Sequence, residues 1–119
     1  MLSIELAENK KIYFASDNHL GAPTAVESKP REAKFVQWLD TIKPDAGAIF
    51  LLGDLFDFWF EYKMVVPKGF VRTLGKLAEL RDSGIPIYFF VGNHDLWMND
   101  YFEKELNIPV FHRPQEVES

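Results

Sequence analysis

Three short polar clusters contain most of the side chains in this chain that could do chemistry. They read Asp17-Asn18-His19, Gly53-Asp54-Leu55-Phe56-Asp57 and Gly92-Asn93-His94-Asp95. Carboxylate, amide and imidazole groups of this kind bind metal ions and transfer protons. Taken singly, each cluster also has an ordinary structural interpretation, because Asp and Asn often cap helices and Gly supplies turns. The spatial relation between the clusters therefore decides between the two interpretations.

Each cluster follows a continuous apolar run of the kind that forms a buried strand. These runs are residues 12–15, 48–52 and 87–91. Between them, apolar residues recur at helical spacing over residues 31–42 and 70–80. We expect Pro30 to lie at the start of the first helix and Gly84 to cap the end of the second.

The alternation of strands and helices predicts an α/β fold with a βαβαβ core, in one small domain, or part of a larger one, over residues 1–119. Residues 2–7 and 110–111 have the composition of further strands, and residues 96–106 that of a third helix. Right-handed crossovers give a parallel sheet, and we expect helices on both of its faces. Because open α/β sheets bind ligands at the carboxyl ends of their strands, we expect the clusters to meet at that edge.

Acidic and imidazole groups gathered at one edge would need cations, because neighbouring carboxylates repel one another. The donors are oxygen and imidazole nitrogen without sulfur, since the chain has no cysteine. Such donors suit Mn²⁺, Fe, Mg²⁺, or Zn²⁺ in a mixed site, and they exclude a thiolate zinc site. We expect two divalent metal ions, with Mn²⁺ as first choice, whose bound hydroxide would attack phosphorus in a phosphoester.

Length and composition exclude several other classes of protein. The 119 residues suffice for one small domain, and 47% hydrophobic with 26% charged residues indicates a globular chain. A net charge of −5 argues against nucleic acid as a partner. The sequence has no P-loop, dinucleotide-binding or Gly-x-Ser-x-Gly motif. Without a signal-peptide pattern or an apolar stretch long enough to span a bilayer, we expect a cytoplasmic protein.

The order and spacing of the clusters resemble the signature of the calcineurin-like metallophosphoesterases. The resemblance covers residues 12–95 and implies the N-terminal half of an αββα sandwich with two metal ions at the strand ends. The implied metal ligands are Asp17, His19, Asp54 and Asn93. Asp54 would bridge the two metals, and His94 would contact the phosphoryl oxygens or protonate the leaving group. Asp57 would orient His94.

Residues 16–21 (SDNHLG) and 53–59 (GDLFDFW) are similar to one branch of that superfamily, the UDP-2,3-diacylglucosamine hydrolases of lipid A biosynthesis. These enzymes cleave a pyrophosphate bond to release UMP and an acylated sugar 1-phosphate. The resemblance implies a lipid-linked nucleotide or other phosphorylated small molecule as partner, with peripheral contact to the inner membrane. Many members of the branch carry Arg where His94 stands. Another phosphoesterase acting on nucleotides or phosphoproteins, or a noncatalytic scaffold of the same fold, therefore remains an alternative.

The resemblance also implies ligands that the sequence does not contain. The family uses a lone His and a Gly-His-x-His segment from its C-terminal half, so we expect this chain alone to bind metal weakly and to be nearly inactive. His112 is not expected to replace them. The aromatic stretch over residues 58–66 would either wall a substrate pocket or pack in the core, and Lys63, Lys68 and Arg72 would either meet phosphate or be solvated.

Overall fold

Strands and helices alternate along the chain. The computed structural model describes residues 2–3, 9–16, 18–22, 24–56, 59, 61, 69–92, 98, 100–112 and 117–118. The strands are β1 (Leu2–Ser3), β2 (Lys11–Ala15), β3 (Ala46–Leu51), β4 (Ile87–Phe90), β5 (Val110–Phe111) and β6 (Val117–Glu118). The helices are α1 (Ala25–Ile42), the short 3-10 helix η1 (Lys43–Asp45), α2 (Val71–Asp82) and α3 (Tyr101–Leu106).

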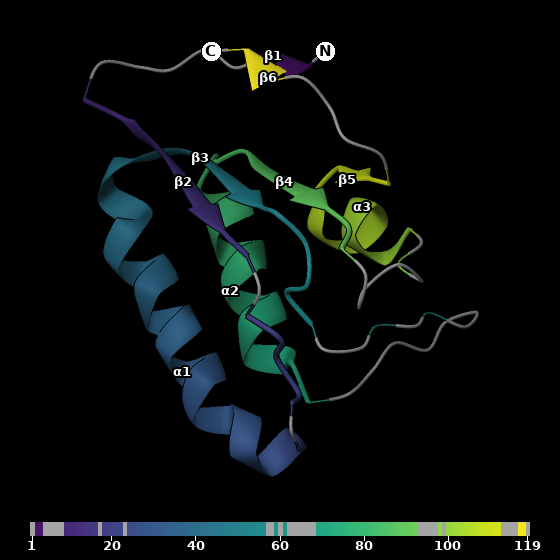
Figure 1. Ribbon diagram of the computed structural model, residues 1–119. Coiled ribbons are helices and arrows are strands. Elements are labelled where there is room, and N and C mark those ends of the chain that lie inside the picture. Colours follow the sequence, from purple (N-terminus) through teal and green to yellow (C-terminus); the bar gives the residue numbers. More distant parts are fainter. Residues whose placement is uncertain are drawn as a thin grey trace.

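The central sheet is parallel and has the strand order β2-β3-β4-β5 (Figure 1). At its carboxyl edge, Ala15 of β2 lies opposite Leu51 of β3, which in turn lies opposite Phe89 of β4. The ends of these strands therefore share one edge, and the predicted parallel α/β architecture is confirmed. The short strands β1 and β6 pair with each other in a separate two-stranded sheet.

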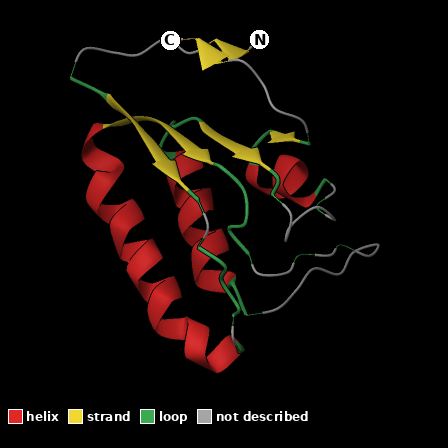
Figure 2. Cartoon of the chain, in the orientation of Figure 1, coloured by secondary structure: helices red, strands yellow, loops and turns green. Residues whose placement is uncertain are grey.

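The helices that the structure describes all cover the same face of the sheet (Figure 2). Their buried side chains include Phe35 and Leu39 of α1, Leu77 and Leu80 of α2, and Phe102 of α3, all in one core with Ile49, Leu51 and Phe89 of the sheet. The other face carries a small separate cluster around Phe50. The prediction of helices on both faces is therefore wrong for the described residues. Because every crossover moves to the next strand in the same direction, right-handed connections place every helix on the same side.

The start of α1 also differs from the prediction. The helix begins at Ala25, and Pro30 lies inside it. Thr24 is the N-cap residue, with extended backbone, and its Oγ1 accepts a hydrogen bond from the Glu27 N–H at 3.1 Å. The Thr24 cap sets the helix start because it satisfies a backbone donor that the first turn leaves free. A proline inside the helix removes one further backbone hydrogen bond but keeps a helical φ.

The end of α2 follows the prediction that Gly84 caps it. Gly84 has a φ of +91°, a conformation that costs glycine little. Its N–H donates to the Arg81 carbonyl oxygen at 2.9 Å, and the Ile85 N–H donates to the Leu80 carbonyl oxygen at 3.1 Å. This pair of bonds is a Schellman motif, which turns the chain from α2 into β4.

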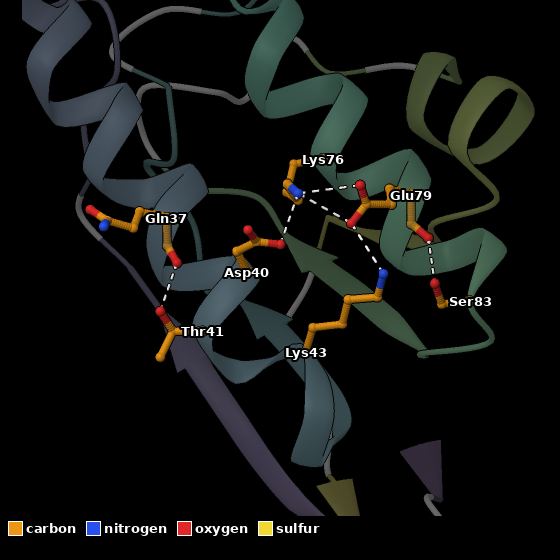
Figure 3. A network of polar contacts seen from close by, with 7 residues as sticks. All are labelled: Gln37, Asp40, Thr41, Lys43, Lys76, Glu79 and Ser83. Atoms are coloured by element: carbon orange, nitrogen blue, oxygen red, sulfur yellow. Dashed lines mark hydrogen bonds and ion pairs between the residues drawn. The ribbon is translucent and has the colours of Figure 1, made fainter.

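Charged side chains join α1 to α2 (Figure 3). Lys76 donates hydrogen bonds to Asp40 at 3.0 Å and to Glu79 at 3.1 Å, and Lys43 contacts Glu79 at 3.3 Å. The bond to Asp40, followed by that to Glu79, raises the pKa of Lys76. Hydrogen bonds from Lys76 and then Lys43 lower the pKa of Glu79. Because such pairs near the surface contribute little free energy, the apolar core between the helices contributes more to their packing than these contacts do.

The remaining predicted elements are present in part. The strand predicted over residues 2–7 is described only at β1, and the helix predicted over residues 96–106 only at α3. The strand predicted at residues 110–111 is confirmed as β5. Among the helices that the structure describes, none combines the length and the apolar character that crossing a membrane requires.

Candidate metal centre at the strand ends

The structure describes part of the predicted site. His19 and Asp54 lie among the described residues. The other predicted site residues, Asp17, Asp57, Asn93 and His94, lie outside them. The geometry of the site therefore rests on His19, Asp54 and the described backbone that flanks the remaining positions.

His19 and Asp54 meet through their backbones. The His19 N–H donates a hydrogen bond to the Asp54 carbonyl oxygen at 2.9 Å, and the Leu20 N–H donates to the Leu55 carbonyl oxygen at 2.9 Å. Leu20 and Phe56 then form an isolated parallel bridge. The pairing of β2 with β3 therefore resumes beyond the ends of both strands. This pairing brings the first two polar clusters side by side.

Both residues adopt backbone conformations that are uncommon for side chains other than glycine. The φ angles are +46° at His19 and +52° at Asp54, and Gly53 before it has a φ of +93°. His, Asp and Asn enter this left-handed region more readily than other residues with a side chain. The two strands thus end in sharp turns, which leave His19 and Asp54 at the carboxyl edge of the sheet.

The third cluster reaches the same point through Gly92. A Cβ atom added to Gly92 would lie 2.5 Å from Asp54 Oδ1 and 2.7 Å from the Asp54 backbone nitrogen. A Cβ added to Gly53 would lie 2.9 Å from the Gly92 Cα. Real Cβ atoms do not approach this closely, so both glycines are needed for the contact. The glycine that precedes Asn93 and His94 in the sequence therefore lies directly against the Asp54 carboxylate.

The described residues fit a divalent metal ion in their donor chemistry. His19 offers an imidazole and Asp54 a carboxylate, and glycine at position 92 leaves space beside that carboxylate which a Cβ would fill. Asp17 and Asn93, the other predicted ligands, adjoin Ser16, Asn18 and Gly92 in the chain. The described residues by themselves contain no group of three or more His, Asp or Glu side chains placed to hold a metal.

Two residues of α1 that were not among the predicted site residues are polar and buried. Ser28 is 3% exposed and Glu32 is 4% exposed. Glu32 accepts a hydrogen bond from the Thr73 hydroxyl at 2.9 Å, which ties α1 to the start of α2. The sequence indicates only the burial of these two residues, because Ser28 and Glu32 continue the helical stripe of Phe35 and Leu39 toward the N-terminus of the helix.

The described part of the aromatic stretch packs in the core. Trp59 is fully buried, and its ring centre lies 4.5 Å from that of Phe56 and 5.5 Å from that of Phe102. Its Nε1–H donates to Glu61 at 2.8 Å, and the same carboxylate accepts the Tyr101 N–H at 3.1 Å. Of the two interpretations of this stretch, substrate pocket or core packing, Trp59 supports core packing. The other aromatic positions of the stretch, and Lys63 and Lys68, lie outside the described residues.

A cavity of about 610 Å³ opens between the end of β2 and α1. Ser16 and Asn18, the residues on either side of Asp17 in the sequence, contribute to its lining. Arg31 and Lys34 supply its positive charge, and the rings of Phe14, Phe35 and Trp38 supply its apolar surface. The cavity therefore borders the chain segment that carries the first predicted metal ligand.

His112 has a structural partner. Its Nε2 lies 2.8 Å from the Met98 carbonyl oxygen, which favours a role in holding the segment after β5 against the chain before α3. The structure thus gives no reason to add His112 to the predicted ligands.

Comparison with known proteins gives a family match over almost the whole chain. The model of the calcineurin-like phosphoesterase family matches residues 10–118. A UDP-2,3-diacylglucosamine hydrolase of Porphyromonas gingivalis is 52% identical over 100 residues, which are 84% of this chain and 38% of that protein.

More distant relatives carry the same name. UDP-2,3-diacylglucosamine hydrolases of Actinobacillus succinogenes and Haemophilus influenzae are 32% identical over 110 residues and 36% identical over 100 residues. These matches cover 91% and 81% of this chain, and 44% and 38% of the relatives. The chain therefore spans less than half the length of these curated relatives.

Proposed function

The chain belongs to the calcineurin-like phosphoesterase family, and on that premise we propose that it forms the metal-binding part of a phosphoester hydrolase. The observation that carries the proposal is the contact between the three clusters. The His19 N–H bonds to the Asp54 carbonyl oxygen, and Gly92 lies against the Asp54 carboxylate. Helix caps or isolated turns would not require the clusters to meet at one point.

In this proposal, the residues of the clusters divide into metal ligands and proton-handling groups. Asp17, His19, Asp54 and Asn93 would hold the divalent metal ions. Bound divalent ions supply Lewis acidity, since they lower the pKa of water and neutralise charge on phosphoryl oxygens. His94 contacts a phosphoryl oxygen of the substrate or donates the proton that the leaving group needs, and Asp57 orients the imidazole.

The proposed substrate is UDP-2,3-diacylglucosamine. Addition of water across its pyrophosphate bond yields UMP and the acylated sugar 1-phosphate. The names of the relatives support this choice, above all the one at 52% identity. A substrate with acyl chains and a nucleotide fits a cytoplasmic enzyme that contacts the inner membrane peripherally. His94 stands where many members of the branch carry Arg, so nucleotides and phosphoproteins are the competing substrate classes.

The proposal can be tested in a hybrid protein. This chain would replace the matching region of the Porphyromonas gingivalis relative, which itself serves as the positive control. We expect the folded hybrid, supplied with Mn²⁺, to release UMP from UDP-2,3-diacylglucosamine, and the 119-residue chain alone to be nearly inactive. Faster hydrolysis of nucleotide diesters would reject the lipid substrate. A folded hybrid that hydrolyses neither compound would favour a noncatalytic scaffold.

A further inference from the structure

The loop that carries His19 is hydrogen-bonded to α1 both before and after that residue in the sequence. Before His19, the Arg31 Nη1–H donates a hydrogen bond to the Asn18 carbonyl oxygen at 2.9 Å. After His19, the Gly21 N–H donates to Ser28 Oγ at 2.7 Å. We infer that Ser28 and Arg31 are positioning residues, which hold the His19 backbone where its imidazole serves the metal centre. This inference rests on the proposed function for the role of the metal.

The bonds from Arg31 and Ser28 complement the other backbone hydrogen bonds of the loop. The His19 N–H bonds to Asp54 and the His19 carbonyl oxygen accepts the Ala22 N–H at 3.1 Å. The peptide groups around His19 are therefore held from the Asp54 side and within their own turn. Bonds from α1 to Asn18 and Gly21 fix the opposite side of the loop. Without them, the turn at His19 would lose both of its described bonds to α1.

Helix α1 can hold the loop in place because it is itself bonded to other parts of the fold. Ser28 and Arg31 are three residues apart, so they occupy neighbouring positions on one helix face. The same turns of the helix are tied to the chain around α2, because Glu32 accepts the Thr73 hydroxyl and Lys29 donates to the Gly69 carbonyl oxygen at 2.7 Å. The loop is thus attached to an element that is itself anchored by a buried hydrogen bond.

The charge of Arg31 allows an electrostatic effect on Mn²⁺ affinity to be distinguished from a positioning effect. A positive side chain close to a metal site repels the metal, so on charge alone the variant Arg31→Ala would bind Mn²⁺ more tightly. If Arg31 acts by holding the loop, the same variant binds Mn²⁺ more weakly. Partners that orient metal ligands in this way typically change metal affinity by about 10–100-fold. The two explanations therefore predict changes of opposite sign.

The experiment measures Mn²⁺ affinity by titration calorimetry on the 119-residue chain. We expect Arg31→Ala and Ser28→Ala each to weaken binding about tenfold. Arg31→Lys keeps the charge but loses the planar donor fork, so we expect it to weaken binding as well. Lys34→Ala is the matched control, since Lys34 lies on the same helix and lines the same cavity but has no described bond to the loop. We expect it to bind Mn²⁺ as tightly as the wild type or slightly more tightly.

A second measurement separates this inference from the proposed function. Amide hydrogen exchange at His19 and Leu20 reports how firmly the loop is held, whether or not metal is present. Because Arg31→Ala removes one hydrogen bond of the loop, we expect exchange at both amides to be about tenfold faster in that variant and unchanged in Lys34→Ala. If the wild-type chain binds no Mn²⁺ but exchange is still faster in Arg31→Ala, the metal centre is rejected and the positioning role is retained. Unchanged exchange in Arg31→Ala and Ser28→Ala, or tighter Mn²⁺ binding by Arg31→Ala, would overturn the inference.

Discussion

The Asp54 carboxylate and the Gly92 backbone occupy adjoining space, with room for no side chain between them. A Cβ on Gly92 would stand 2.5 Å from Asp54 Oδ1. This contact links the loop after β3 to the loop after β4 beside Asp54, one of the predicted metal ligands. It also explains why glycine begins the third polar cluster, since any other residue would push the carboxylate away.

Substitution of Gly92 tests that contact. Gly92→Ala forces the Asp54 side chain and backbone to shift, and we expect a loss of about 1–3 kcal/mol in the free energy of unfolding. Gly75→Ala is the control, because a Cβ there meets nothing within 4 Å and the residue lies inside α2. We expect that change to stabilise the chain by about 0.5–1 kcal/mol. Urea denaturation measures both, and equal stabilities of the two variants would contradict the close approach.

The buried carboxylate of Glu61 should be important for folding. Glu61 is 8% exposed and accepts hydrogen bonds from the Trp59 indole and the Tyr101 N–H. Glu61→Ala leaves both donors without this acceptor, and we expect a cost of about 2–3 kcal/mol, measured by thermal denaturation. Glu105→Ala on the exposed side of α3 should stay within about 0.5 kcal/mol of the wild type. A Glu61 variant as stable as the Glu105 variant would show that these bonds contribute nothing.

Asn18 offers a stabilising substitution inside the loop that carries His19. Its Oδ1 is buried and has no hydrogen-bond partner among the described residues. Because a buried acceptor without a partner costs about 1–3 kcal/mol, Asn18→Leu should raise the free energy of unfolding by about 1 kcal/mol. Asn18→Asp would place a charge at the same position and should be destabilising. A lower melting temperature for Asn18→Leu than for the wild type would show that Oδ1 has a partner after all.

Stability at acid pH should depend on Asp45. The Tyr13 hydroxyl donates to Asp45 at 2.8 Å and, with a smaller contribution from Lys11, holds the pKa of Asp45 below its usual value. Its contribution to stability is therefore complete above the unfolded-state pKa of about 4 and is lost as the pH falls through the lower folded-state pKa. Tyr13→Phe should raise the pKa of Asp45 and reduce the extra stability seen above pH 4. Carboxyl NMR titration checks this, and an unchanged Asp45 pKa in Tyr13→Phe would contradict it.

The strands and the second helix were predictable from sequence because the residues that determine them lie within each segment. Apolar runs such as that of β3 match a strand buried on both faces, and Gly84 supplies the conformation that ends α2. The layering was not predictable, because it depends on the strand order. Nothing within a single segment shows that β2, β3, β4 and β5 follow one another across the sheet.

The candidate site also has residues that the sequence identifies and residues that it does not. His19 and Asp54 could be selected from residue type and spacing, because only a few side chains bind metals or transfer protons. Ser28 and Arg31 could not, because they bond to the backbone of Gly21 and Asn18. Backbone amides and carbonyls are present at nearly every position, so no residue pattern in the sequence identifies the ones that are used.

The central claim is that the ends of β2 and β3 carry a metal centre built on His19 and Asp54. Titration of the 119-residue chain with Mn²⁺ tests it most directly, with His19→Ala and Asp54→Ala as variants and His112→Ala as the matched control. Saturable binding that either site variant weakens by at least about tenfold, and that His112→Ala leaves unchanged, is the predicted result. Absence of saturable binding, or equal affinity in the wild type and both site variants, would contradict the account.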